Sequence, residues 1–279
     1  MAKKIDQSNL KFQEFIRTIN KKMGYDAITI GSSELEFLPT GISSLDTMLC
    51  GGIPKARTTI IWGPKSAGKS SLTYHIIKHN MKNQDKMIMV IDAEHILDPQ
   101  YLQTVYEIDV NKLLIVRPER FEDIAVIASE AAKQQVVSLV VIDSIVAVST
   151  EKELKQIERK GFEGDTMAAL PQAITKFFKA TTDIFYRAGI SLIVINQIRE
   201  DMEMFSGQKY RMPGGNHLKH QSALTLFVKR MSKTDMRKYK LDLENEFGVY
   251  VKVEFAKTGA KEGSEVAIKY VYGKGFSDI

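Results

Sequence analysis

Short runs of apolar residues recur along the chain and are separated by segments with helical periodicity. The first run, 57–62, is rich in β-branched residues and ends in Trp62, which is typical of a buried strand. The segment 71–81 then places Leu72, Ile76 and Ile77 on one face of a helix. Further strands are predicted at 87–91, 113–116, 137–142 and 190–195, with helices at 121–135 and 172–187. Continuous apolar strands separated by helices predict a parallel sheet that is covered on both faces.

The pattern changes after Lys219. Three apolar runs, at 223–229, 248–255 and 265–272, follow one another without a crossover helix between them. Strands without crossover helices predict an antiparallel extension of the sheet. The expected fold is therefore α/β: a mostly parallel central sheet flanked by helices, with antiparallel strands added toward the C-terminus.

A separate amphipathic helix is predicted near the N-terminus, at 8–23, followed by a polar stretch that contains glycine. We expect residues 1–38 to form this helix and a linker, and residues 39–279 to form the α/β core. A helix on such a linker either packs on its own core or docks on a neighbouring subunit, and its sequence does not choose between the two.

The loop between the first strand and its helix fits the phosphate-binding pattern G-x-x-x-x-G-K-[ST] at every fixed position. Glycines at both ends let the backbone approach phosphate oxygens, and the loop amides and the helix N-terminus face a polyanion. Lys69 should reach the β- and γ-phosphates of ATP, and the Ser70 hydroxyl should ligate Mg²⁺. A glycine-rich turn that contains Lys-Ser by chance is the alternative, and the strand before it and helix after it argue against that. The loop residues are Gly63, Pro64, Lys65, Ser66, Ala67, Gly68, Lys69 and Ser70, with Ser71 next to them.

Polar residues end the predicted parallel strands, where ligands bind in open α/β sheets. Asp143 is the candidate Mg²⁺ carboxylate, acting through water, and Glu94 is the candidate for polarising the attacking water. Gln197 could contact the γ-phosphate from the end of its strand. Tyr101 could stack on adenine, or it could be a core tyrosine. Asp92, Ser144 and Asn196 also lie at these strand ends.

Composition narrows the function classes. The chain has 279 residues, a net charge of +5 and a single cysteine, which excludes an intramolecular disulfide. No apolar run approaches the roughly 20 residues that span a bilayer, and no signal-peptide pattern follows Met1, so a cytoplasmic protein without membrane contact is expected. Between Gln197 and Lys240, ten Lys or Arg residues face four Asp or Glu residues. This excess is a candidate nucleic-acid surface, although a solvated basic face would look the same.

Two polar, glycine-containing segments, about 151–169 and 199–216, leave the strand ends on the nucleotide side. Basic residues interleaved with Met, Phe and Tyr suit single-stranded DNA, because charge follows the phosphates while apolar side chains contact the bases. The alternative is a lid on the ATP site that has no DNA role. The candidate DNA-binding residues are Lys160, Met167, Arg199, Met202, Phe205, Lys209, Arg211, Gly214, Gly215 and Asn216.

With these motifs the chain resembles the bacterial RecA family of homologous recombinases. The motifs occur in the same order as in that family and at similar spacing, and the resemblance covers nearly the whole chain. They are Gly63–Ser70, Ile91-Asp92-Ala93-Glu94-His95 with Leu97-Asp98-Pro99, Val141-Ile142-Asp143-Ser144, Ile195-Asn196-Gln197-Ile198-Arg199 and Gly214-Gly215-Asn216. The resemblance implies a RecA-like P-loop NTPase core and an ATP- and Mg²⁺-dependent helical filament on single-stranded DNA. That filament would pair with homologous double-stranded DNA and exchange strands.

The resemblance also implies residue roles and partners. Glu94 would be the catalytic carboxylate, with Lys69 at the phosphates and Gln197 as the γ-phosphate sensor. Asp98, Tyr101 and Lys257 would join the nucleotide site, Lys257 from a neighbouring subunit. The N-terminal helix would pack on the adjacent protomer, and a single-strand-binding protein and loader proteins are possible partners.

The sequence departs from the family pattern in three places, and other functions stay open. His220 stands where an aromatic residue is usual, Phe255 occupies the position of a second lysine, and the family's C-terminal domain is not expected. The alternatives are a RecA-like paralogue that loads or regulates another recombinase, a hexameric helicase or packaging motor, and a small-molecule kinase with a P-loop.

Overall fold

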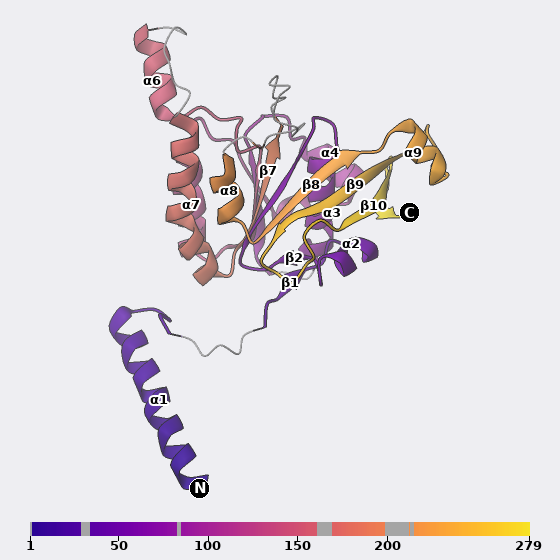
Figure 1. Cartoon of the computed structure of the whole chain (residues 1–279). Helices are drawn as coiled ribbons and strands as arrows, with labels where there is room; N and C mark the ends of the chain where they lie inside the picture. The colour runs from indigo at the N-terminus through magenta and orange to yellow at the C-terminus, as the bar shows by residue number, and fades with distance from the viewer. Residues whose placement is uncertain (1, 29–33, 83–84, 161–168, 199–211, 213–214) are drawn as a thin grey trace. The chain divides into compact units, whose positions relative to one another are not determined.

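The computed structural model describes residues 2–28, 34–82, 85–160, 169–198, 212 and 215–279 (Figure 1). The chain divides into two compact units, 1–35 and 36–279. The first unit contains helix α1 (Ala2–Met23), which ends at Gly24, where a positive φ of 77° lets the Gly24 amide bond the Asn20 carbonyl. Leu10, Phe12 and Phe15 of this helix are exposed.

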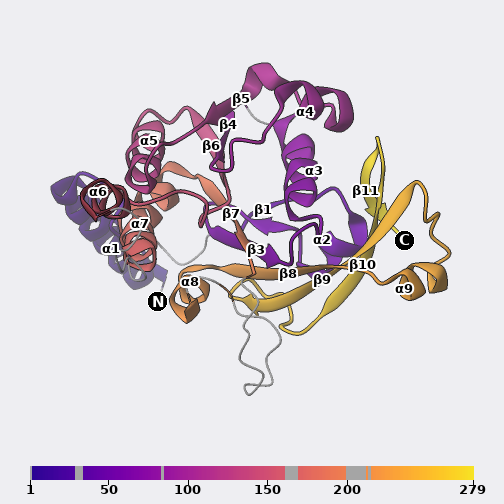
Figure 2. The same cartoon turned by 90° about the horizontal axis from the view of Figure 1, so that it is seen from above.

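The described part of the second unit is built on a nine-stranded sheet in the order β11-β10-β9-β8-β3-β7-β6-β4-β5 (Figure 2). The six strands from β8 to β5 are parallel, and β9, β10 and β11 continue the sheet antiparallel. The predicted α/β fold with an antiparallel extension is thus confirmed. The strands are β3 (Thr58–Gly63), β4 (Met87–Asp92), β5 (Leu113–Val116), β6 (Val137–Asp143), β7 (Ser191–Gln197), β8 (Leu224–Arg230), β9 (Glu246–Ala256), β10 (Glu265–Val271) and β11 (Gly275–Asp278).

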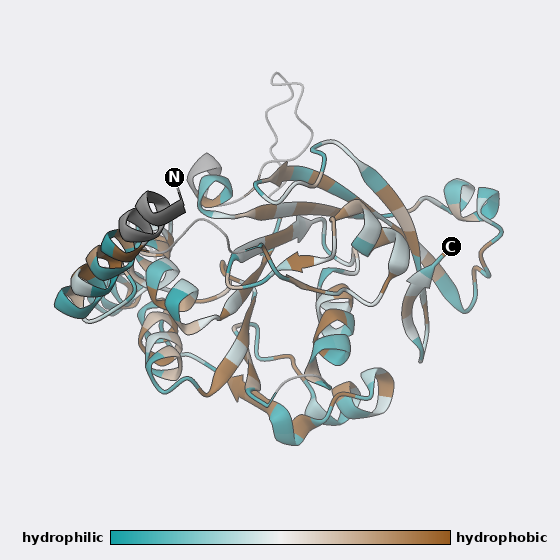
Figure 3. Cartoon of the chain, turned by 90° about the horizontal axis from the view of Figure 1, so that it is seen from below, coloured by the Kyte–Doolittle hydropathy of each residue, from teal (hydrophilic) through white to brown (hydrophobic). Residues whose placement is uncertain are grey.

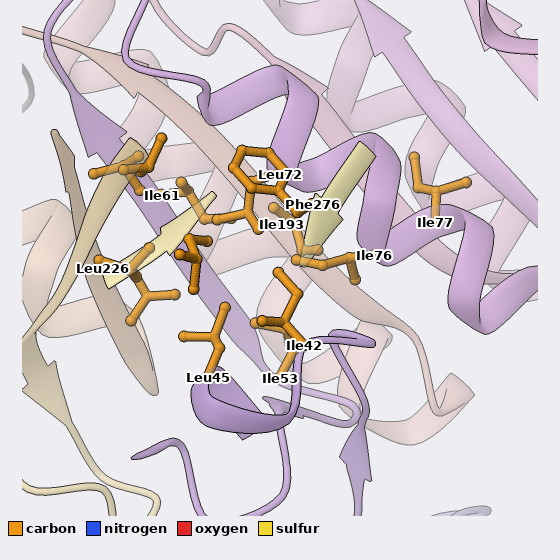
Figure 4. Close-up of a cluster of buried hydrophobic side chains, with 14 of the residues drawn as sticks. Ile42, Leu45, Ile53, Ile61, Leu72, Ile76, Ile77, Ile193, Leu226 and Phe276 are labelled. Atoms are coloured by element: carbon orange, nitrogen blue, oxygen red, sulfur yellow. The ribbon is translucent and has the colours of Figure 1, made fainter. Parts of the chain in front are cut away.

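Helices cover both faces of this sheet, so both faces of each central strand are buried. Successive residues of β3 show why such a strand is apolar throughout. Ile61 packs with Leu72 of α3 and with Leu226 on one face (Figure 4), whereas Ile60 and Trp62 belong to the core on the opposite face. Figure 3 shows hydrophobic colour along the strands and hydrophilic colour on the outer sides of the helices. Helices α2 (Ser43–Met48), α3 (Lys69–Met81) and α4 (Pro99–Tyr106) contribute to the first core, and α5 (Phe121–Lys133), α7 (Ala169–Ala188) and α8 (Gly215–Gln221) to the second.

The remaining elements are short. Strands β1 (Phe37–Leu38) and β2 (Ile53–Pro54) form a separate antiparallel pair. A 3-10 turn, η1 (Val110–Lys112), precedes β5, and α9 (Lys233–Lys238) lies between β8 and β9. Among the described residues, no helix is long and apolar enough to cross a membrane.

The three runs after Lys219 pair antiparallel with one another as predicted, and β8 also pairs parallel with β3, which was not predicted. The run 223–229 therefore belongs to the parallel half of the sheet and marks its boundary. The physical reason is the connection from β7, because it contains helix α8 and is long enough to return the chain in the same direction.

The segment 151–169 also differs from expectation, because its first part is helix α6 (Glu151–Lys160) and not a loop. Thr150 and Glu153 form a reciprocal cap: the Thr150 amide donates to the Glu153 carboxylate at 2.7 Å, and the Glu153 amide donates to the Thr150 hydroxyl at 3.2 Å. Glu151 and Lys155 add an ion pair one turn apart. Residues 161–168 lie outside the described part of the chain.

Candidate nucleotide site at the strand ends

The loop between β3 and α3 has the backbone geometry of a phosphate-binding turn. Gly63 ends β3 so close to β8 that a Cβ atom there would overlap the Val228 carbonyl oxygen. Gly68 has a φ of 93° at the N-cap of α3, and Ser66 also lies in the left-handed region at 58°. The loop thus turns sharply over the strand end and presents the N-terminus of a 13-residue helix.

Lys69 is buried under this loop and holds its ammonium group on the loop's own carbonyls. Its Nζ donates to the Gly63 oxygen at 3.0 Å and to the Pro64 oxygen at 2.6 Å, and the residue is only 6% exposed. Burial lowers the pKa of Lys69, and the negative charges of Asp143 and Glu94 oppose that shift. The charges of both carboxyl groups thus act on the ammonium, whose observed partners are the two carbonyls, and a polyphosphate could replace these carbonyls as its partner.

A cavity of about 230 Å³ opens between this loop and the ends of the neighbouring strands. Loop residues 65–71 line one side, and Glu94, Asp143, Ile195 and Gln197 line the other. The structure thus brings together the P-loop and the three strand-end residues that the sequence singled out for chemistry.

Asp143 ends β6 inside this cavity. Burial raises the pKa of its carboxyl group to about 6, with a hydrogen bond from the Ser70 hydroxyl acting in the opposite direction and the Glu94 charge adding to the increase. The Asp143–Ser144 peptide bond is cis. A hydroxyl and a carboxylate side by side are hard oxygen ligands of the kind that Mg²⁺ prefers, so this pair fits that ion. In the described ranges no group of three His, Cys, Asp or Glu residues could hold a metal by itself, so phosphate oxygens or water would complete the shell.

Glu94 lies where three strands converge. Its Oε1 atom accepts hydrogen bonds from the Ser144 hydroxyl at 3.0 Å and from the Gln197 amide nitrogen at 2.5 Å. Ser144 directly follows β6, and Gln197 is the last residue of β7. The Glu94 carboxylate, on the loop after β4, is therefore oriented by side chains from the ends of two other strands. One oxygen of Glu94 is engaged in this way, and a carboxylate has a second that could orient a water molecule.

Three expected nucleotide residues lie away from the cavity wall. Asp98 caps helix α4 by accepting the Gln100 amide at 2.9 Å. Tyr101 is 46% exposed and contacts the Tyr106 ring edge-on, so it is not a core tyrosine. Lys257 donates to the His220 carbonyl oxygen at 3.0 Å, and its ammonium lies 5.3 Å from the centre of the Phe255 ring. Their roles at a nucleotide stay predictions.

Most of the expected DNA-binding residues fall outside the described part of the chain: Met167, Arg199, Met202, Phe205, Lys209, Arg211 and Gly214. Lys160 is the last residue of α6, and Gly215 and Asn216 begin α8. The described remainder of the basic window includes the end of β8 and helix α9, where Lys229, Arg230, Lys233 and Arg237 lie.

One residue near this site was not singled out from the sequence. Arg117 directly follows β5 and contacts both the Asp92 carboxylate and the Leu97 carbonyl oxygen, at the two sides of the loop that carries Glu94. The rule that selected Asp92 and Asp143, a polar residue at the carboxyl end of a parallel strand, also applies to Arg117.

Comparisons with known proteins agree with these features. The RecA N-terminal domain family matches residues 11–277. The chain is 33% identical to Protein RecA of Aquifex pyrophilus over 270 residues, covering 95% of this chain and 74% of that protein. It is 32% identical to Protein RecA of Phytoplasma mali (strain AT), with 96% and 78% covered. The crystal structure of the RadB recombinase shares the fold at a TM-score of 0.63 and 19% identity, over 87% of this chain and all of that one. The chain belongs to the RecA family.

Proposed function

We propose that this protein is an ATP-dependent DNA recombinase that forms a helical filament on single-stranded DNA and pairs it with homologous double-stranded DNA. The observation that carries the proposal is the convergence of Lys69, Asp143, Glu94 and Gln197 on one cavity in a member of the RecA family. These residues supply a phosphate cradle, a metal carboxylate and an oriented carboxylate, which are the parts that phosphoryl transfer to water requires.

ATP would bind with its phosphates along loop residues 63–70. The loop amides and the α3 N-terminus would face the phosphate oxygens, and Lys69 would exchange the Gly63 and Pro64 carbonyls for the β- and γ-phosphates. Ser70 and Asp143 would hold Mg²⁺, which supplies positive charge to the phosphates when it is bound. Glu94, kept in place by Ser144 and Gln197, would orient the attacking water.

Gln197 offers a route from the nucleotide to DNA. It donates to Glu94 inside the cavity, and only Ile198 separates it from the segment 199–211. A γ-phosphate that competes for the Gln197 amide would therefore act directly on the start of that segment. We propose that 161–168 and 199–216 contact single-stranded DNA through the basic and apolar residues named above, with Lys160 at the end of α6.

The residues that do not line the cavity have proposed roles at its edge or across a subunit interface. Asp98 and Tyr101 would contact the adenine end of ATP, for which the exposure of Tyr101 gives support. Lys257 would leave the His220 carbonyl and contact the nucleotide of a neighbouring protomer. This role is compatible with the observation that Lys257 does not line the cavity of its own chain. Helix α1, with exposed Leu10, Phe12 and Phe15, would pack on the adjacent protomer.

The test is ATP turnover of the full chain with and without single-stranded DNA, with negative-stain imaging of the same samples. We expect DNA to stimulate turnover, regular filaments to form with ATP and DNA together, and the stimulation to weaken as salt increases. Exchange of a labelled strand into a homologous duplex, with a heterologous duplex as the control, then tests recombination. Nucleotide binding without filaments or stimulation would instead favour a regulatory paralogue.

A further inference from the structure

The loop that carries Glu94 is folded back on the end of its own strand. Asp92 ends β4 and is buried, and its two carboxylate oxygens accept the amides of Ile96 at 3.1 Å and Leu97 at 3.2 Å. His95 has a φ of 56°, in the left-handed region, where the chain reverses. Residues 93–97 therefore form a tight turn whose two sides meet at the Asp92 side chain.

Arg117 closes this turn from the neighbouring strand. Its Nε atom donates to the Asp92 carboxylate at 3.1 Å, and its Nη2 atom donates to the Leu97 carbonyl oxygen, also at 3.1 Å. A guanidinium group can serve two acceptors at once because its donors are fixed in one plane. We call this pair of hydrogen bonds the Arg117 bridge, and it links β5 to both sides of the turn.

Glu94 lies inside the turn, and the backbone at the start of the turn is also held by a hydrogen bond. The Ala93 amide donates to the Asp143 carbonyl oxygen at 2.9 Å, which ties the start of the turn to β6. The Glu94 carboxylate then reaches Ser144 and Gln197. The position of that carboxylate depends on the backbone of 93–97, and the bridge joins the far end of this turn to β5, in addition to the contacts that Asp92 makes from β4.

We propose that Arg117 is a positioning residue for Glu94: by bridging Asp92 and Leu97, it holds the turn in the conformation that keeps the Glu94 carboxylate beside Ser144 and Gln197. The inference rests on the proposed role of Glu94 in ATP hydrolysis and adds a residue to that site. Arg117 does not line the cavity, so its effect passes through Glu94 and not through ATP binding.

A purely structural role is the competing explanation, because Asp92 is a buried carboxylate whose charge Arg117 compensates. The two explanations differ in what changes. Loss of a stabilising ion pair lowers the melting temperature without selecting one kinetic constant. Loss of positioning lowers the rate of hydrolysis and leaves ATP binding and KM nearly unchanged.

The experiment compares Arg117→Gln with Arg120→Gln in the full-length protein. Arg120 is the matched control, because its side chain is also 46% exposed and paired with an aspartate, but it contacts Asp123 at the start of α5 and not the turn. Binding of a fluorescent ATP analogue, single-turnover hydrolysis with and without single-stranded DNA, and melting temperature are measured for each. We expect Arg117→Gln to slow hydrolysis by about 10- to 100-fold with binding within a few-fold, and Arg120→Gln to leave both unchanged.

A double-mutant cycle with Glu94→Gln makes the test specific. If Arg117 acts through Glu94, then Arg117→Gln removes little further rate from a Glu94→Gln protein, whereas independent effects would multiply and overturn the inference. Normal hydrolysis by Arg117→Gln, in a protein that Glu94→Gln inactivates, would also overturn it. Normal hydrolysis by Glu94→Gln itself would instead reject the proposed function.

Arg117→Lys covers the case in which the glutamine variant does not fold. Lysine keeps the positive charge beside Asp92 but lacks the planar group that serves both acceptors. We expect hydrolysis to stay several-fold below wild type in this variant. Full activity with lysine would show that charge alone is needed and would contradict the bridge.

Discussion

The P-loop at 63–70 and the turn at 93–97 face the same cavity, but different contacts hold them in place. The P-loop depends on its own backbone: Gly63 fits under β8, Gly68 starts α3, and Lys69 bonds to carbonyls of the loop itself. The turn has one local contact, from Asp92 to the Ile96 and Leu97 amides, and otherwise depends on side chains from other strands, namely Arg117, Ser144 and Gln197. The substrate-binding half of the site is thus local in sequence, whereas the catalytic half is assembled by tertiary contacts.

This comparison predicts that P-loop changes remove binding, while changes around the turn remove hydrolysis and spare binding.

Lys69→Ala should remove both nucleotide binding and turnover. The variant loses a buried ammonium that could pair with phosphate, and a loss of about 2–5 kcal/mol corresponds to roughly 30- to 4000-fold in affinity. Titration with a fluorescent ATP analogue measures the loss. Lys82→Ala, at the C-cap of the same helix, is the control with the same change of charge. Near-normal ATP affinity of Lys69→Ala would show that the P-loop is not the nucleotide-binding site.

Asp143→Asn should change the pH dependence of the site. Because the pKa of Asp143 rises from 3.8 to about 6 in the folded protein, folding favours its protonated form, and its ionisation above pH 6 destabilises the ligand-free protein. The asparagine variant should therefore gain about 1–3 kcal/mol in unfolding free energy relative to wild type as the pH rises from about 4 to 7. Urea unfolding at several pH values measures this gain.

The same substitution should remove a pH effect on Mg²⁺. In wild type, protonation of Asp143 below about pH 6 should weaken Mg²⁺-dependent ATP binding, because the proton competes with the metal for the carboxylate. Asp143→Asn should bind ATP with little response to Mg²⁺ and without this transition. An unchanged Mg²⁺ requirement in the variant would exclude Asp143 as the metal carboxylate.

Ser144→Ala should have the smallest effect. It removes one of the two donors to Glu94 and leaves Gln197 in place, so a loss of about 1 kcal/mol, or roughly 5-fold in single-turnover rate, is expected. Binding should not change. If affinity for ATP fell instead, Ser144 would contribute to ATP binding. That result would contradict the prediction that changes around the turn affect only hydrolysis.

The accuracy of the sequence predictions follows the same division. The P-loop, its flanking strand and helix, and the strand ends at Asp143 and Gln197 were predictable because apolar periodicity and a local motif specify them. The parallel pairing of β8 was not, since strand direction depends on the whole connection through α8. Helix α6 had a local signal, the Thr150–Glu153 cap, which the charge pattern of 151–169 obscured. Strand β11 (Gly275–Asp278) was missed because Phe276 is its only apolar residue, whereas β5, which is equally short, is apolar throughout.

The turn that carries Glu94 shows where a single sequence stops being informative. Asp92 and Glu94 are identifiable at a strand end, but the partners of these carboxylates come from β5, β6 and β7, and only the folded sheet brings them together. Arg117 has the right position at a strand end and no motif around it. Asp98 and Lys257 illustrate the reverse case, because a family pattern assigns them to the nucleotide while their observed contacts are a helix cap and a carbonyl oxygen.

The most direct test of the central claim is to measure ATP affinity and single-turnover hydrolysis on the same preparation of Glu94→Gln. We expect affinity to stay within a few-fold of wild type, while the hydrolysis rate of bound ATP falls by about 100- to 10,000-fold. Hydrolysis at the wild-type rate, or a loss of affinity as large as that of Lys69→Ala, would contradict the separation of a binding half from a catalytic half.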